Sequence, residues 1–357
     1  FHTIHIHRRN ARVGNLVSNF SDFIGGGGGG GTGFPTMYFQ QSMTWACPVA
    51  MEAMVYVIGG GGSGGQESFQ ASYSVNGGGA GGCAVSKLTL AAQDYTLVIG
   101  SGGASRSDYG TGTSYSGDGF AGGNTSMSGT GMTTMTGNGG GAGKQWNSGS
   151  GTKSVGGSAT GGNLYNNTGG GSVNYSTGGV NTRGAAGGGA VGLIGDGQDG
   201  QKNTLLSGGG GLYRQIGLGG SCFGMNTLSE YMEGDSDSAV MSLRRASYKL
   251  NGKVTSDVFS GLERIIDYDF NADTGLRTVP TGASLLPEVV GGYYSCPPAG
   301  PFDGGMGFGS TGQIYGGSGT CGGGGGGINY GGGYTYNSRP GGGGAGIVII
   351  CPLSIGA

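Results

Sequence analysis

Histidines, whose imidazole rings bind transition metals well, lie together at the start of this sequence. The chain has 3 histidines, all within residues 2–7, and His5 and His7 share one face of a β-strand. In a trimer this pair would bring two imidazoles from each subunit to a common axis. The sequence therefore offers His5 and His7 as metal ligands, with a solvated or β-paired terminus as the alternative.

A second group of candidate metal ligands alternates with other residues in a later, charged part of the chain. Its members are Asp267, Asp269, Asn271 and Asp273. Oxygen ligands at this spacing match the first four ligand positions of a calcium-binding loop. Ala272 stands where that loop needs glycine, and Thr278 stands where it needs glutamate. The alternative is a solvated acidic turn.

Side chains for catalysis are scarce. No histidine follows His7, so Ser/His/Asp and Cys/His arrangements lack their base in the rest of the chain. A pair of carboxylates for a hydrolase is formally available among Glu230, Glu233, Asp235 and Asp237. Acidic clusters are usually solvated surface. We therefore expect a protein that is not an enzyme and that uses no cofactor.

Glycine supplies 94 of the 357 residues, including the uninterrupted run Gly25–Gly31. The glycines lack the Gly-X-Y period of collagen, and the chain has only 9 prolines. Charged residues make up 10% and hydrophobic residues 35%, which argues against an expanded disordered chain. The net charge is −2 and no basic stripe is visible, so nucleic-acid binding has no support. Such a chain needs a backbone architecture that uses bare Cα atoms.

Short apolar runs that end in glycine predict β-strands. They are β-branched-rich, of strand length, and in one case alternate at period two. We expect strands near 53–58, 85–90, 95–99 and 346–351. The last of these is strongly apolar and must find a partner, most simply among the strands of 53–99. The expected arrangement is a small antiparallel β-sandwich.

Glycine clusters recur between the strands, separated by polar segments. They lie at 139–141, 169–171, 187–189 and 208–211. The polyproline II helix has three residues per turn and no internal hydrogen bonds, so glycine helices packed side by side can bond to their neighbours. Only glycine permits this approach, and Cα–H···O contacts add a weak increment. The predicted fold class is therefore mainly β and polyglycine II, with a lattice of packed polyglycine II helices joined to the sandwich.

The composition divides the chain into four parts. Residues 1–44 form an N-terminal segment for attachment or oligomerisation, and 45–221 hold the start of the sandwich and the lattice. Residues 222–303 concentrate the charges and contain two stretches with helical apolar spacing, so we expect an α/β insertion. Residues 304–357 return to the glycine lattice and the closing strand.

The order of these elements resembles the glycine-rich domain of bacteriophage tail fibres. The resemblance begins at Trp45-Ala46-Cys47-Pro48, continues through the glycines of 59–65 and 99–103, and ends in Gly-Gly-Gly-Gly-Ala-Gly-Ile-Val-Ile-Ile. It is also similar to the distal adhesins of T-even-type phages. The charged insertion departs from the family pattern and is itself a candidate for the receptor-binding tip.

The resemblance implies a virion tail protein that attaches the phage to a bacterial surface receptor, either a polysaccharide or an outer-membrane protein. It implies other tail subunits as partners, a homotrimer, and assembly in the host cytoplasm. Aromatic rings and asparagines in the loops suit such recognition, because they give contact area at low entropic cost. The candidate receptor-binding residues are Tyr109, Tyr115, Trp146, Tyr165, Asn166, Asn167 and Tyr175. The alternative is that these rings cap the lattice or pack against a neighbouring subunit.

Two other functions remain open. The first is a purely structural virion fibre or decoration protein without receptor contact. The second is a non-viral fibrous or ice-binding bundle of polyproline II helices, although residues 125–130 and 132–136 lack the strict threonine spacing of a flat face. The 6 cysteines are widely spaced and contain no C-x-x-C pair, so we expect buried reduced thiols rather than a zinc site.

Overall fold

The structure is a computed structural model that describes part of the chain. The described residues are 36–67, 73–106, 116–147, 153–172, 184–185, 188–193, 195–200, 203–207, 213–217, 288–290, 293–295, 302, 304, 307–310, 314–315, 323, 327–329 and 338–356. They form β-strands and extended connections and include no helix. The α/β character predicted for 222–303 lies outside them, apart from two short strands and Phe302. No helix within the described residues is long and apolar enough to cross a membrane.

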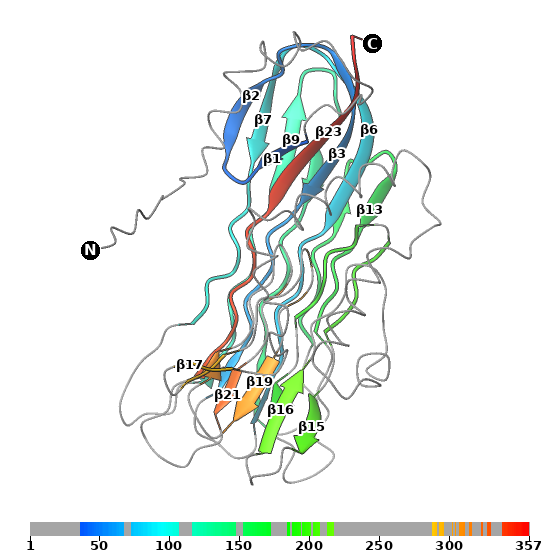
Figure 1. Cartoon of the computed structure of the whole chain (residues 1–357). Coiled ribbons are helices and arrows are strands. Elements are labelled where there is room, and N and C mark those ends of the chain that lie inside the picture. Colours follow the sequence, from blue (N-terminus) through cyan, green and yellow to red (C-terminus); the bar gives the residue numbers. More distant parts are fainter. Residues whose placement is uncertain are drawn as a thin grey trace, which may run out of the picture.

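Two five-stranded sheets, antiparallel throughout, lie together at one end of an elongated molecule (Figure 1). The first sheet has the order β1 (Met37–Phe39), β23 (Ile347–Ile355), β3 (Met51–Ile58), β6 (Cys83–Leu90) and β13 (Tyr165–Asn167). The second has the order β12 (Ala159–Thr160), β10 (Met135–Gly137), β9 (Thr125–Gly129), β7 (Asp94–Val98) and β2 (Met43–Ala46).

The closing strand pairs as the sequence predicts. β23 lies antiparallel to β3 from Ile347, opposite Ile58, to Ile355, opposite Met51. Three of the four predicted strands form the centre of the first sheet, whereas the strand predicted near 95–99 belongs to the second sheet as β7. There Tyr95 and Leu97 are buried, whereas Asp94, Thr96 and Val98 are exposed, so the alternating pattern reflects a sheet with one solvated face.

Each face of the first sheet is covered by a separate core. The core between the two sheets contains Val55 and Val57 of β3 and Leu97, Met127 and Met135 of the second sheet. Its aromatic rings contact one another at tilted angles, with the ring centroids of Phe39 and Trp45 5.6 Å apart and those of Trp45 and Tyr95 5.7 Å apart. On the opposite face, the other side chains of β3 and β23 pack against residues 190–193 and Phe302. Burial on both faces explains why β3 and β23 are almost continuously apolar.

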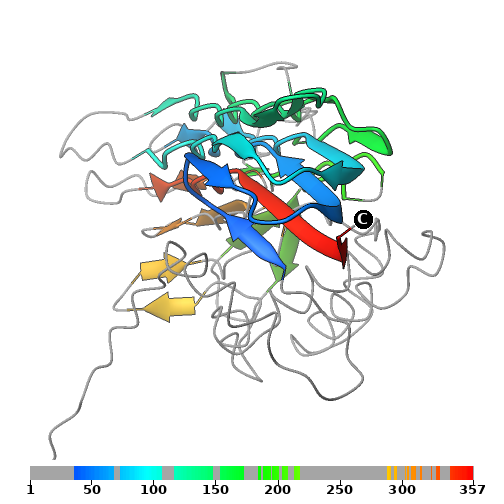
Figure 2. The same ribbon diagram turned by 90° about the horizontal axis from the view of Figure 1, so that it is seen from above.

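Glycine-rich segments extend from the sheets toward the other end of the molecule. We call these segments the glycine bundle, which comprises 59–65, 76–82, 100–105, 118–124, 138–144, 153–158, 168–172, 188–193, 195–200 and 341–346. Viewed from above, the strands and the segments that continue them lie in stacked rows (Figure 2).

Backbone hydrogen bonds join the segments of the glycine bundle in a regular rotation. In segment 59–65, the N–H groups of residues 59, 62 and 65 donate to the carbonyl groups of 82, 79 and 76. Those of 60 and 63 donate to 123 and 120, and those of 61 and 64 donate to 344 and 341. The partner segment therefore changes from each residue to the next, and the same partner segment recurs at every third residue. All three partner segments run antiparallel to 59–65.

Segment 76–82 is enclosed by its neighbours. The N–H groups of 76, 79 and 82 donate to 144, 141 and 138, whereas the N–H of Ala80 donates to Gly170. Its carbonyl groups accept from segments 59–65, 153–158 and 188–193. These buried backbone groups of segment 76–82 are thus hydrogen-bonded without an α or β ladder.

Steric contact explains why the enclosed positions are glycine. A Cβ added to Gly62 would overlap the carbonyl of Gly141, and one added to Gly79 would overlap the carbonyl of Val155. Positions that face solvent can carry side chains instead. Phe120, which is 49% exposed, and Val155, which is 62% exposed, occupy such positions.

Short strands close the other end of the molecule (Figure 1). They are β4 (Gln66–Glu67), β5 (Tyr73–Val75), β8 (Ser116–Gly117), β11 (Gln145–Asn147), β14 (Gly184–Ala185), β15 (Asn203–Ser207), β16 (Tyr213–Gly217), β17 (Glu288–Val290), β18 (Tyr293–Ser295), β19 (Gly307–Ser310), β20 (Ile314–Tyr315), β21 (Gly327–Asn329) and β22 (Ser338–Arg339). They form three-, six- and four-stranded sheets that include parallel pairs.

Candidate functional site

The bundle gives the molecule two distinct ends. We call the end with the two five-stranded sheets the sheet end and the end with the short strands the far end. The chain leaves β3 through 59–65 to reach β4 and returns from β5 through 76–82 to reach β6. Segments 100–105 and 118–124 make the same excursion between β7 and β9. The connections between outgoing and returning segments are therefore all attached at the far end.

Most of the predicted receptor-binding residues fall in these far-end connections. Tyr109 and Tyr115 lie between Arg106 and β8, and Tyr175 follows Ser172; all three are outside the described residues. Trp146 lies on β11, where its backbone is opposite Ser74 of β5. The topology thus brings the attachment points of these connections together, and receptor contact by the four aromatic residues stays a prediction.

The remaining predicted residues lie at the sheet end, where they have contacts within the fold. Tyr165 packs against the core on the outer face of the first sheet. The side chain of Asn166 accepts from the Gly162 N–H and donates to the Gly162 carbonyl, both at 2.8 Å. Asn167 is buried and donates from Nδ2 to the Gly192 carbonyl at 2.9 Å. These contacts give the triplet a structural role, and a role in receptor binding for it stays a prediction.

The predicted metal ligands all lie outside the described residues. They are His5, His7, Asp267, Asp269, Asn271 and Asp273. Within the part of the chain that the structure describes, no group of three or more His, Cys, Asp or Glu residues is placed to hold a metal ion. Both metal sites therefore remain sequence predictions.

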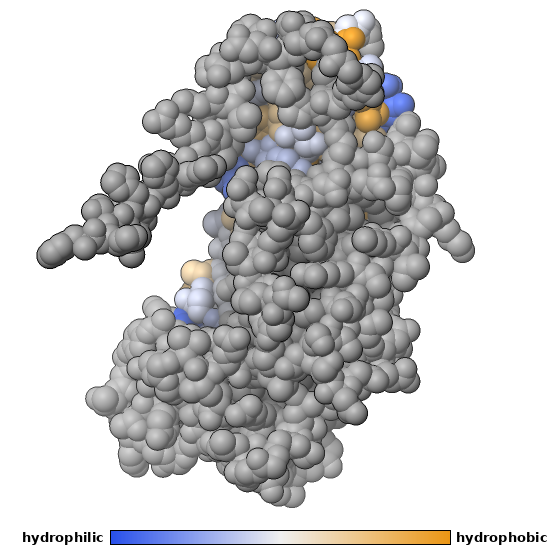
Figure 3. All heavy atoms as spheres, viewed as in Figure 1, coloured by the Kyte–Doolittle hydropathy of each residue, from blue (hydrophilic) through white to orange (hydrophobic). Residues whose placement is uncertain are grey.

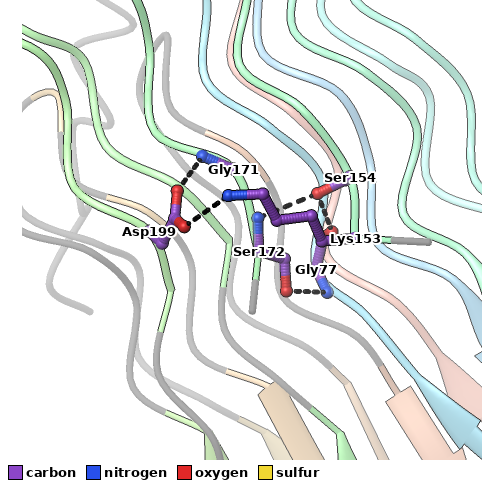
Figure 4. Close-up of polar contacts among 6 residues, drawn as sticks. All are labelled: Gly77, Lys153, Ser154, Gly171, Ser172 and Asp199. Carbon is purple, nitrogen blue, oxygen red and sulfur yellow. Dashed lines mark hydrogen bonds and ion pairs between the residues drawn. The ribbon is translucent and has the colours of Figure 1, made fainter. Parts of the chain in front are cut away.

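Polar side chains complete the bundle where its regular bonding is interrupted (Figure 4). The Asp199 carboxylate accepts from the Gly171 N–H at 2.7 Å and pairs with the Lys153 ammonium at 3.0 Å. Ser154 donates to the Gly77 carbonyl at 2.7 Å, and the Gly77 N–H donates to Ser172 Oγ at 3.1 Å. This role was not predicted, although serine and aspartate beside glycine clusters are a signal for it in the sequence.

A cavity of about 520 Å³ opens at the sheet end between the two sheets. It lies beside the end of β6, the turn from β9 to β10, and the turn from β12 to β13. The lining residues are Ser86, Leu88, Thr89, Leu90, Ala91, Gln93, Tyr95, Thr130, Gly131, Met132, Thr133, Gly161, Gly162 and Asn163. None of them carries a formal charge. This site could not be expected from the sequence, because its residues come from β6, β7 and turns that are far apart along the chain.

The face of the sheet end seen in Figure 3 places hydrophobic and hydrophilic residues side by side. The ion pair between Lys87 and Glu52, at 3.2 Å, joins neighbouring strands with both side chains about one third exposed. Such a pair contributes little to stability, because solvent screens it.

The described cysteines are buried free thiols, as predicted for Cys47, Cys83 and Cys351. Burial raises the pKa of Cys83 to about 12. Burial also raises the pKa of Cys47 and outweighs the opposing effect of the Val49 backbone. The Cys47 thiol donates a hydrogen bond to the Val49 carbonyl at 3.2 Å. These thiols are therefore protonated at neutral pH and are poor nucleophiles.

Comparison of the chain with known protein families and with curated proteins gives no match.

Proposed function

We propose that the glycine bundle is a lattice of polyglycine II helices and that the two sheets form the β-sandwich on which it is built. The support is the rotation of hydrogen-bond partners with a period of three in segment 59–65. A helix with three residues per turn directs successive N–H groups to three sides in this way. At about 3.1 Å per residue, a seven-residue segment would hold the two ends of the molecule about 22 Å apart.

We further propose that the protein is a tail fibre tip that attaches a phage to a bacterial surface receptor. The observation that carries this proposal is the attachment of the aromatic-containing connections at one end of a hydrogen-bonded scaffold. Loops on a rigid frame can change in sequence without loss of the fold, which suits recognition. The sheet end would then face the rest of the tail.

A structural virion protein is the second candidate. It is favoured by Tyr165, Asn166 and Asn167, whose side chains all have contacts within the fold. In that case the far-end aromatic residues would contact neighbouring subunits. The two candidates differ in whether replacing a far-end connection changes binding to cells.

The test is binding of fluorescently labelled full-length protein to a panel of Gram-negative strains, with strains lacking O-polysaccharide included. We expect saturable binding to a subset of strains. Replacement of residues 107–115, which include Tyr109 and Tyr115, by a Gly/Ser sequence of equal length should weaken it at least tenfold. The matched control is Thr96→Ala, an exposed change at the sheet end. Absence of binding to every strain, or equal binding by the replaced protein, would count against receptor attachment.

A further inference from the structure

We propose that the cavity at the sheet end binds an uncharged sugar ring. The cavity lies at the opposite end of the glycine bundle from the connections assigned to receptor attachment. It is therefore a separate site, and its argument does not depend on the proposed function.

The cavity exists because two strands are shorter than their neighbours. β12 and β13 contain only two and three residues and are joined by the turn that includes Gly161 and Asn163. β6 extends beyond this turn to Leu90, so the core between the sheets is open on that side. The volume of about 520 Å³ is within the usual range of small-molecule sites, roughly 300–1,000 Å³.

The walls of the cavity are held in place by hydrogen bonds. Asn163 donates its N–H to Ser86 Oγ at 2.9 Å, and its side-chain amide bonds to both the N–H and the carbonyl of Lys87. Across the opening, Gln93 Nε2 donates to the Thr130 carbonyl at 2.9 Å. A ligand would therefore enter a preformed site and would pay little to order it.

The lining combines an apolar wall with hydroxyl groups. Leu88 and Met132 are half-buried members of the edge of the inter-sheet core. Thr130 and Thr133 are exposed, and their hydroxyl groups have no hydrogen-bond partner within the described residues. A pyranose ring has matching properties, because its C–H face is apolar and its edge carries hydroxyl groups.

The absence of charge in the lining selects against other ligands. A phosphate or carboxylate would lose hydration without gaining a charged partner from any lining residue. A wholly apolar ligand would cover the hydroxyl groups of Thr130 and Thr133 and leave them unpaired. An uncharged molecule with both apolar and hydroxyl surfaces satisfies both conditions.

Met132 provides a direct probe, because it lines the cavity. The protein would be labelled with ¹³C at methionine methyl groups and titrated separately with D-glucose, D-galactose and N-acetyl-D-glucosamine, with glucose 6-phosphate as the charged comparison. We expect at least one uncharged sugar to shift the Met132 methyl signal saturably. Glucose 6-phosphate should bind at least tenfold more weakly than that sugar.

Two variants test the location of binding. Thr133→Trp and Thr130→Trp place a large side chain at the opening, and each should weaken binding at least tenfold. Thr96→Trp, an exposed change on the solvated face of β7, should leave binding unchanged. The buried Met54 methyl signal reports whether each variant keeps the core. The proposal fails if no uncharged sugar shifts Met132, if the phosphate binds equally well, or if both cavity variants bind like the unmodified protein.

Discussion

Substitution of one enclosed glycine tests the packing of the glycine bundle. Gly79 donates its N–H to the Gly141 carbonyl and accepts from the Gly62 N–H, both at 2.8 Å. A Cβ at this position would overlap the carbonyl of Val155, so Gly79→Ala must separate the segments. Overpacking costs about 1–3 kcal/mol, and two weakened hydrogen bonds cost about 0.5–1.5 kcal/mol each. We expect the free energy of unfolding to fall by about 2–6 kcal/mol.

The matched control is Gly342→Ala, also in the bundle. An added Cβ at Gly342 meets its nearest atom, the Gly103 carbonyl oxygen, at 3.5 Å, which is ordinary contact. The φ angle of Gly342 is not in the left-handed region. Alanine should therefore be neutral, or stabilise the fold by about 0.4–1 kcal/mol, because it lowers the conformational entropy of the unfolded chain. Urea unfolding of both variants measures the difference. If Gly79→Ala and Gly342→Ala agree within about 0.5 kcal/mol, close backbone packing is not what requires glycine.

Four further predictions concern other parts of the fold. Gly170→Val places its Cβ against the Gln198 carbonyl and should prevent folding, as judged by the yield of soluble protein and its melting temperature; normal values for both would contradict the bundle. Ser154→Ala removes the buried donor to the Gly77 carbonyl and should cost about 1–3 kcal/mol in urea unfolding, whereas exposed Ser158→Ala should cost less than about 0.5 kcal/mol. Asp199→Asn keeps an oxygen that can accept from the Gly171 N–H, and the half-exposed ion pair with Lys153 adds little, so this variant should lose less free energy of unfolding than Asp199→Ala. If both variants lose the same free energy of unfolding, the charge of Asp199 rather than its hydrogen bond stabilises the fold. Burial raises the pKa of the folded Cys83 thiol from 9.0 to about 12, so the folded thiol stays protonated at pH values where the unfolded thiol ionises. The contribution of this thiol to the free energy of unfolding is therefore complete below pH 9 and falls between pH 9 and 12. Cys83→Ala should flatten that part of the curve of stability against pH, and an unchanged slope would refute the assignment.

The strands near both ends of the chain could be predicted because their sequences have a clear periodicity. β3 and β23 are apolar at successive positions, since both faces of their sheet are covered, and only another apolar strand could pair with them. β7 alternates because one of its faces is solvated. The partition into two sheets could not be predicted, since β9, β10 and β12 are short and rich in serine, threonine and glycine.

The extent of the glycine bundle was underestimated for a steric reason. Only positions that face a neighbouring backbone require glycine, so segments with one solvated side contain other residues there. Phe120 and Val155 occupy such exposed positions in 118–124 and 153–158. Segments 59–65 and 76–82 are not among the glycine clusters named from the sequence, yet they are the most enclosed members of the bundle.

The candidate sites were predictable to different degrees. The sequence identified aromatic residues between glycine clusters, but only the path of the chain separates Tyr109 and Tyr115 from Tyr165, which lies at the sheet end. The cavity was beyond sequence reasoning, since Thr89, Thr133 and Asn163 become neighbours only through the packing of two sheets.

Hydrogen exchange in segment 59–65 tests the central claim most directly. All seven N–H groups of this segment are hydrogen-bonded, although it is neither helix nor strand. The account predicts that these amides exchange only on global unfolding, with protection comparable to that of β3. Exchange of this segment at the rate of an unstructured glycine chain, while β3 remains protected, would contradict it.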